Sequence, residues 1–222
     1  IESWNMENPK LYMLDVQLMH DEKIIDDLIE RVGFREVSLQ GNKLCLNGEP
    51  VFLRGFNRHE DYGVIGCAIP PQLMMQDMDL MQDMGANAVR TCHYPNDEMF
   101  LDLCDEFGLL VWEEAHARGL NEEKMSNPNF IPQSLACIEE MIENHYNHPS
   151  VIMWGILNEC VSDTEFGREC YKTLYDKIDS LDKNNLVDDS ANFIDVFSVD
   201  FDSEDFTYDP ERNEILFDFK SK

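Results

Sequence analysis

Short apolar runs separated by polar turns fill the first part of this 222-residue chain. The runs at residues 11–19 and 34–39 have the length and composition of β-strands. A polar turn, Leu46-Asn47-Gly48-Glu49, comes after them. We therefore expect residues 1–40 to be the end of an all-β module, followed by a hairpin.

From Val51 onward, apolar strand-like runs alternate with longer segments of helical periodicity. Four short runs have the composition of strands, and the last two of them are continuously apolar: residues 51–56, 86–91, 109–112 and 151–156. Four longer segments repeat their apolar residues at helical spacing: residues 72–84, 97–107, 131–146 and 165–181. Gly85 and Gly108 directly follow the first two, where helices commonly end. Because continuously apolar strands are typical of sheets covered on both faces, this order predicts a parallel α/β sheet.

The last part of the chain is strongly acidic. Residues 200–218 carry eight acidic side chains and one basic side chain, so we expect residues 201–222 to be a loosely packed tail. Residues 188–201 have room for two short strands. Over the whole chain, 45 acidic residues outnumber 17 basic ones, and the formal net charge is −28. This balance excludes a module that binds duplex nucleic acid, because neutralising phosphates requires clustered Lys and Arg.

Three further features concern compartment and partners. No run of 18 apolar residues occurs, so the sequence predicts no membrane-spanning helix. The seven cysteines lack the spacing of a zinc site or a disulfide framework, which favours reduced thiols. Nothing near Ile1 has the basic-then-apolar build of a signal peptide. We therefore expect a cytoplasmic protein with neither a membrane nor a nucleic acid as partner.

Ionisable and hydrogen-bonding residues follow each of four predicted strands. They occupy residues 57–60, 90–95, 113–116 and 158–159. In a closed parallel barrel, the carboxyl ends of all strands meet at one rim, where active sites lie. Polar loops that follow strands by chance would explain one or two such ends, whereas four in succession predict a functional site.

Three ordered motifs stand around these strand ends. They are residues 53–60 (LRGFNRHE), 87–95 (NAVRTCHYP) and 147–159 (NHPSVIMWGILNE). Together they resemble glycoside hydrolase family 2, the family of β-galactosidases and β-glucuronidases.

The resemblance implies an α/β fold of the (β/α)8 TIM-barrel type. About six of the eight strands would lie in residues 41–200, so the barrel would be incomplete. Residues 9–12 and 33–35 resemble the end of the immunoglobulin-like β-sandwich that precedes the barrel in this family. Residues 1–40 are therefore assigned to the C-terminal part of such a sandwich, and residues 201–222 show no resemblance.

The resemblance also implies hydrolysis of terminal β-glycosides, either β-galactosides or β-glucuronides, with retention of configuration. A retaining glycosidase places two carboxyl groups roughly 5–5.5 Å apart around the anomeric carbon. Glu159 matches the family's general acid/base. It follows a strongly apolar strand, so we expect a buried carboxyl group, and burial favours the protonated form that a general acid needs.

Other residues match or surround the family's sugar-binding groups. Asn158 matches an asparagine whose amide hydrogen-bonds the 2-hydroxyl group in the transition state, and His93 matches a histidine that contacts substrate. Arg90 is expected to pair with carboxylates of the site, because an isolated buried guanidinium is costly. Asn158 could instead be a turn residue, and His93 a packed loop histidine. Further candidates for lining the site are His59, Glu113, Glu114 and His116.

A metal site is a separate question. Glu114 and His116 have the spacing of the Glu-x-His pair that holds magnesium in β-galactosidases of this family. The pair stands earlier relative to the strand-end carboxylates than the family's motif does, and Arg118 follows it with a charge that repels cations. We therefore predict no tight metal site and no cofactor, with magnesium as the one ion that the resemblance suggests.

The second carboxylate of the reaction is not recognisable in the sequence. The family's nucleophile is a glutamate at the end of the seventh strand, roughly 90 residues beyond Glu159 at ~30 residues per βα unit. Only 63 residues follow Glu159, and none of the acids among them resembles it. We expect the chain to be part of a longer enzyme, a homo-oligomer that binds a carbohydrate. The alternative is a non-catalytic or vestigial carbohydrate-binding fragment.

Overall fold

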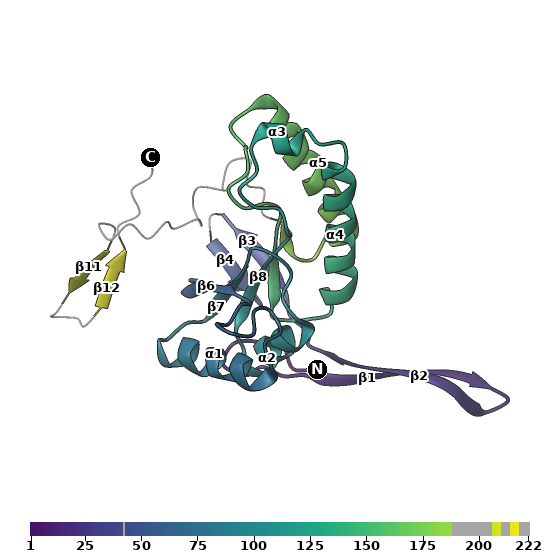
Figure 1. Ribbon diagram of the computed structural model, residues 1–222. Coiled ribbons are helices and arrows are strands. Elements are labelled where there is room, and N and C mark those ends of the chain that lie inside the picture. Colours follow the sequence, from purple (N-terminus) through teal and green to yellow (C-terminus); the bar gives the residue numbers. More distant parts are fainter. Residues whose placement is uncertain (42, 188–205, 210–213, 218–222) are drawn as a thin grey trace. The chain divides into compact units, whose positions relative to one another are not determined.

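A five-stranded parallel sheet organises the larger of two structural units (Figure 1). The computed structural model describes residues 1–41, 43–187, 206–209 and 214–217. The larger unit spans Ile1–Asp188, and the smaller unit spans Asp189–Lys222.

Each strand of this sheet lies beside the next strand along the chain. The order is β10-β9-β8-β7-β6, and every neighbouring pair is parallel. The strands are β6 (Gly55–His59), β7 (Ala88–Cys92), β8 (Leu110–Glu114), β9 (Val151–Gly155) and β10 (Leu186–Val187). The helices between them are α1 (Pro71–Asp83), α2 (Glu98–Phe107), α3 (Glu122–Met125), α4 (Phe130–His145) and α5 (Glu165–Leu181). This confirms the predicted alternation, and it has the order of an incomplete TIM barrel.

The sheet is buried because its strands present apolar side chains to the covering helices. Val151 and Trp154 of β9 are 0% exposed, and Phe100 of α2 and Leu174 of α5 are fully buried. Each such burial contributes roughly 1.5–3 kcal/mol. Helices α1 and α2 pack against each other, as do α4 and α5 (Figure 1).

Local signals at the helix ends explain why the predicted boundaries agree with the structure. The side chain of Asp97 caps α2 by accepting a hydrogen bond from the Met99 N–H. Gly108 ends the same helix with φ of 74°, a left-handed conformation that favours glycine. Thr164 caps α5 in the same way as Asp97 caps α2. The four predicted helices begin and end within one residue of the observed ones, and α5 agrees at both ends.

The first strand of the sheet lies later than predicted. The sequence predicts a strand over residues 51–56, but β6 begins at Gly55. Val51 and Leu53 instead pack against a buried apolar cluster, which explains why this segment is apolar without belonging to the parallel sheet. The cluster consists of Trp4, Leu46, Leu110 and Ile152. The one-turn helix α3 was not predicted, because four residues are too few to display a period.

The N-terminal strands form two small antiparallel sheets. One is the hairpin of β1 (Tyr12–His20) and β2 (Lys23–Val32), and the other joins β3 (Val37–Gln40), β4 (Lys43–Leu46) and β5 (Glu49–Pro50). Strand β2 is not among the predicted runs, because charged residues interrupt its apolar positions. Most residues of the β1–β2 hairpin are exposed, and no second sheet covers it among the described residues. The immunoglobulin-like sandwich therefore stays a prediction.

The smaller unit contains one described element, an antiparallel hairpin of β11 (Phe206–Asp209) and β12 (Glu214–Phe217). This hairpin lies within the tail that was predicted to be loosely packed. The strands predicted over residues 188–201 lie outside the described residues. Across the described part of the chain, no helix combines the length and the apolar character needed to cross a membrane.

Candidate active site

The carboxyl ends of β7, β8 and β9 converge on one buried carboxylate, Glu114, which is 0% exposed. Its Oε1 accepts a hydrogen bond of 2.6 Å from Nη2 of Arg90, and its Oε2 lies 2.8 Å from Nδ1 of His93. The same Nη2 of Arg90 donates to Oδ1 of Asn158 at 2.8 Å. Four of the predicted site residues therefore form one connected network.

The charges of this network are balanced within it. Arg90 and Glu114 are both buried, and each provides the other's counter-charge. The Arg90 guanidinium also lies over the ring of Trp112, 4.4 Å from its centroid, which is a favourable cation–π position. Removing one partner of a buried pair costs about 3–5 kcal/mol, because the other charge is left uncompensated. We expect this network to be rigid.

His59 brings the fourth strand end to the same place. Its ring meets that of His93 edge to face, with centroids 5.2 Å apart, and lies 6.1 Å from the ring of Tyr94. Partial burial lowers the pKa of His59, and the nearby charges of His93 and Arg118 lower it further. His59 is therefore neutral near pH 7, where it can donate one hydrogen bond and accept another.

Glu159 lies at this rim, but it is not buried as predicted. The residue is exposed and has φ of 49° in the left-handed region. The Asn158 N–H donates to the Ala117 carbonyl, and the Gly119 N–H donates to the Asn158 carbonyl, both at 2.9 Å. These bonds fix the backbone so that Asn158 contacts the buried network while Glu159 faces solvent. The expectation of a buried Glu159 carboxyl group is therefore wrong.

His116 is exposed, and the hydrogen bonds that Glu114 makes go to Arg90 and His93 instead. Partial burial lowers its pKa. Both oxygens of Glu114 are already engaged, by Arg90 and His93, so the Glu-x-His spacing does not produce a shared cation site.

A second donor set, Cys92 with His93 and Glu114, has ligand atoms within 4.8 Å of one another. Burial raises the pKa of Cys92 to about 12, so its sulfur is a neutral thiol, which is a poor metal ligand. Magnesium prefers oxygen ligands, and a guanidinium bonded to one of these oxygens opposes any cation. These residues do not fit magnesium, and its absence from the enzyme's chemistry stays a prediction.

Glu113 does not join the network, although it stands next to Glu114. Its Oε1 lies 2.8 Å from Nδ1 of His145 in α4, on the face of the sheet that the helices cover. Burial raises the pKa of Glu113, and the hydrogen bond to His145 reduces that effect. Side chains alternate between the two faces of a strand, so consecutive glutamates cannot both reach the site.

Sequence reasoning missed the residues that support the network. The hydroxyl of Thr91 accepts a hydrogen bond of 3.1 Å from the Glu114 N–H, and Trp112 underlies Arg90. Arg90 and Trp112 are paired in the register of β7 and β8. Paired residues of neighbouring strands share a face, so a correct strand register would have identified Trp112 as a neighbour of the site.

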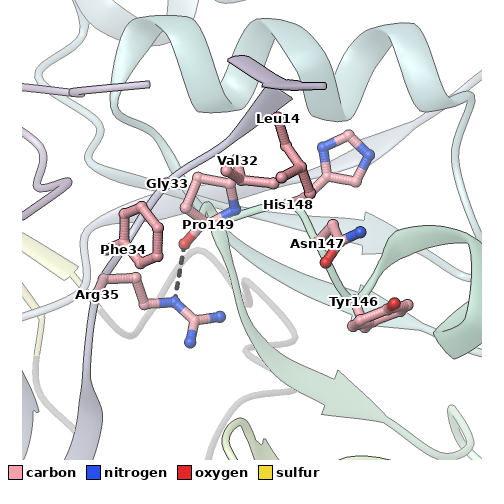
Figure 2. Close-up of a pocket in the computed structure, with 9 residues that line it drawn as sticks. All are labelled: Leu14, Val32, Gly33, Phe34, Arg35, Tyr146, Asn147, His148 and Pro149. Atoms are coloured by element: carbon pink, nitrogen blue, oxygen red, sulfur yellow. Dashed lines mark hydrogen bonds between the residues drawn. The ribbon is translucent and has the colours of Figure 1, made fainter. Parts of the chain in front are cut away.

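A separate pocket of about 400 Å³ is lined by other residues (Figure 2). Leu14 of β1, residues 32–35 and residues 146–149 line it. Among these residues, Nε of Arg35 donates to the Pro149 carbonyl at 3.1 Å (Figure 2). A Cβ atom on Gly33 would come within 2.6 Å of the Pro149 ring, so only glycine permits this close approach. None of the predicted site residues lines this pocket.

Comparison with known proteins decides the family. A family model described as "Glycosyl hydrolases family 2, TIM barrel domain" matches residues 37–218. The chain belongs to glycosyl hydrolase family 2. The match includes residues 201–218, where the sequence motifs showed no resemblance.

Individual family 2 relatives are glycosidases. The chain is 34% identical over 222 residues to a β-galactosidase of Thermoanaerobacter pseudethanolicus, covering 94% of the chain and 28% of the relative. A β-galacturonidase of Eisenbergiella tayi, solved with bound galacturonate, is 55% identical with a TM-score of 0.82, covering 84% of this chain and 33% of that one. A β-D-glucuronidase of Dictyoglomus thermophilum is 31% identical with a TM-score of 0.80, covering 84% and 34%. The family 2 chain thus spans about a third of the length of these glycosidases.

Proposed function

We propose that the protein to which this chain belongs hydrolyses terminal β-glycosides by a retaining, double-displacement mechanism. The observation that carries the proposal is the network of Arg90, His93, Glu114 and Asn158 beside Glu159 at the rim of a family 2 barrel. An inert carbohydrate-binding fragment would have no need of a buried, charge-balanced network at that rim.

Glu159 is the proposed general acid/base. In the first step its carboxyl group donates a proton to the leaving oxygen, and in the second its carboxylate removes a proton from the attacking water. The left-handed backbone at Glu159, held by the hydrogen bonds around Asn158, gives the side chain a defined starting direction. Its exposure in this chain fits a group that exchanges protons with water between the two steps.

Asn158 is the proposed sugar-binding residue. Its Oδ1 accepts a hydrogen bond from Arg90, so its amide Nδ2 is turned away from Arg90 and is available to donate. Donation to the 2-hydroxyl group of the sugar becomes stronger as the oxocarbenium-like transition state develops. His93, which is partly exposed and held by Glu114, is the proposed second contact with the sugar.

The nucleophile is proposed to be a glutamate that is supplied from outside residues 1–187. Glu114 is unsuited to that role, because both of its oxygens are bonded to Arg90 and His93 and its side chain has no contact with solvent. A carboxylate at roughly 5–5.5 Å from Glu159 would complete the retaining pair. No metal ion is assigned a role in this mechanism.

The proposed substrates are β-galactosides and the β-glycosides of uronic acids. Identity is 55% to the galacturonate-bound β-galacturonidase, against 34% to the β-galactosidase, which favours a uronide. We also propose that the complete enzyme is a cytoplasmic homo-oligomer.

The test uses the complete protein and a set of 4-nitrophenyl β-glycosides: the galacturonide, the glucuronide and the galactoside. We expect hydrolysis of at least one of them, fastest for a uronide, and proton NMR should detect the β-anomer of the sugar first. Appearance of the α-anomer first would contradict the retaining mechanism. Absence of hydrolysis, with the sugar still bound, would favour the carbohydrate-binding alternative.

A further inference from the structure

Glu113 and Glu114 are consecutive residues at the end of β8, and both are 0% exposed. Glu114 meets Arg90 and His93 on the inner face of the sheet, which is the face that carries the site. Glu113 meets His145 of α4 on the outer face, which the helices cover. We propose that Glu113 is a positioning residue: its hydrogen bond to His145 fixes the end of β8, so that Glu114 holds Arg90 and His93 in their working geometry. This role rests on the proposed glycosidase function.

One side-chain hydrogen bond, to His145, orients the Glu113 carboxyl group. Its Oε1 bonds to His145, while Oε2 has no hydrogen-bond partner within the described part of the chain. A half-satisfied buried carboxyl group is a poor way to gain stability, because an apolar side chain of similar volume would fill the space without the desolvation cost. We therefore infer that the Glu113 carboxyl group serves to orient the end of β8, and not to stabilise the fold.

The site side of the strand leaves little room for Glu114 to move. Gly155 of β9 is paired with Glu114, and a Cβ atom at Gly155 would lie 3.1 Å from Cγ of Glu114 and 2.6 Å from Nε1 of Trp112. The Glu114 N–H is also held by Thr91. Space this tight means that a small rotation at the end of β8 displaces the carboxylate that Arg90 and His93 share.

His145 stands beside a second buried pair, His148 and Asp105. Because that pair contacts His145, it is unsuitable as a control. The ring of His145 meets that of His148 edge to face, with centroids 5.8 Å apart, and Nδ1 of His148 lies 2.7 Å from Oδ2 of Asp105. A better control is the bond of 2.9 Å from Nε1 of Trp154 to Asp182, which also ties the outer face to the helix layer. The residue after Trp154 is Gly155, so this bond orients no side chain of the site.

The experiment compares variants of the complete enzyme, assayed well below their unfolding temperatures. Glu113→Leu should lower kcat/KM about 10- to 100-fold, since small misplacements of reacting groups have effects of that size. The loss should fall mainly on kcat, because the contacts of Asn158 and His93 strengthen in the transition state. Glu113→Gln can still accept the hydrogen bond from His145 and should stay close to the wild type. The control Asp182→Ala should lower Tm without lowering kcat.

Three results would overturn the inference. They are wild-type kcat/KM in Glu113→Leu, an equal loss in Glu113→Gln, or an equal loss of kcat in Asp182→Ala. If Glu113→Leu does not fold, His145→Phe removes the same hydrogen bond from the helix side and must lower kcat in its place. A wild-type enzyme that hydrolyses no β-glycoside would overturn the proposed function, whereas an active enzyme with an unaffected Glu113→Leu variant overturns this inference alone.

Discussion

Both faces of the parallel sheet carry buried polar side chains, but the two faces connect them differently. On the inner face, Arg90 and His93 share the carboxylate of Glu114, and Arg90 also holds Asn158. On the outer face, two polar pairs each join a strand to the helix layer, namely Glu113–His145 at 2.8 Å and Trp154–Asp182 at 2.9 Å. Arg58 differs from them, because it bonds to Asn96 at 2.7 Å and to Glu60 as well as to Asp77.

The difference teaches how one sheet can support both chemistry and stability. In the inner network, changing one residue disturbs groups on three strands, so we expect effects that do not add. In the outer pairs, each bond joins one strand to the helix layer, so we expect mainly local and additive effects on stability. Glu113 is the proposed exception, because its neighbour along the strand belongs to the inner network.

The largest expected effect concerns Glu159 at the rim of the inner face. In the complete enzyme, Glu159→Gln should lower turnover of glycosides with poor leaving groups by about 100- to 10,000-fold, because those leaving groups need the proton that Glu159 supplies. Aryl glycosides with activated leaving groups should keep their first step, which needs little protonation.

Azide provides the check on that assignment. As an external nucleophile that needs no general base, it should restore release of the sugar from the Glu159→Gln variant, as a glycosyl azide. Equal loss on all substrates, with no response to azide, would contradict the role of Glu159. A matched control is Glu165→Gln, which changes another exposed glutamate nearby in the sequence.

The next effect concerns the centre of the inner network. Glu114→Gln removes the charge that balances buried Arg90, so the free energy of unfolding should fall by about 3–5 kcal/mol. Urea unfolding would measure the loss of stability, and kcat/KM should fall in the same variant because His93 loses its partner. A double variant with Arg90→Gln should lose less than the sum of the two single changes, whereas strict additivity would contradict a shared network.

A smaller effect is expected at the buried pair of Asp105 in α2 and His148 in the loop before β9, and it should depend on pH. Burial lowers the pKa of His148, but the hydrogen bond and charge of Asp105 outweigh burial, so the pKa lies above its ordinary value. Protonated His148 therefore stabilises the folded state: this contribution is complete below about pH 6.5, the ordinary pKa of histidine, and is lost as the pH rises through the raised value.

The variant Asp105→Asn tests this dependence. It should lower the free energy of unfolding by about 1–3 kcal/mol at pH 6, and by less at pH 8.5, because the wild type loses the contribution as the pH rises through the raised pKa. Asp102 and Glu113 also raise the pKa of His148 and stay in place, so part of the pH dependence should survive. Asp176→Asn, which breaks an exposed ion pair with Lys172, serves as the control and should change stability little at either pH. A loss that grows with pH would contradict the pairing.

The smallest effect concerns the reactivity of two thiols, one in the interior and one at the surface. Cys92 at the inner end of β7 is 0% exposed and its pKa is raised to about 12, whereas Cys67 is exposed. Iodoacetamide should alkylate Cys67 in the folded enzyme well before Cys92, because the thiolate is the reactive form. Peptide mass spectrometry over time would measure the two rates. Equal rates would mean that the inner face opens to solvent.

The elements of the sheet were largely predictable from the sequence because their signals are local. Helix α5 agrees with its predicted bounds, and Asp97 and Gly108 mark the ends of α2 through contacts within a few residues. The strand predicted over residues 51–56 was misplaced because its first apolar residues pack on a cluster that contains Trp4 and Leu46, which are distant from this run in the sequence. A run of apolar residues in the sequence indicates that they are buried, but it does not indicate which element covers them.

The family and the identity of the strand-end residues were determined by the sequence alone, since motifs such as residues 87–95 and 147–159 need no coordinates. Which of those residues meet was decided only by the tertiary structure. The alternation of β8 sends Glu114 to Arg90 and His93 but sends Glu113 to His145. The backbone turn after β9 buries Asn158 and leaves Glu159 exposed. The physical reason is that burial and hydrogen bonding depend on residues of other strands and helices that lie close in space. The residues adjacent in the sequence do not specify which ones those are.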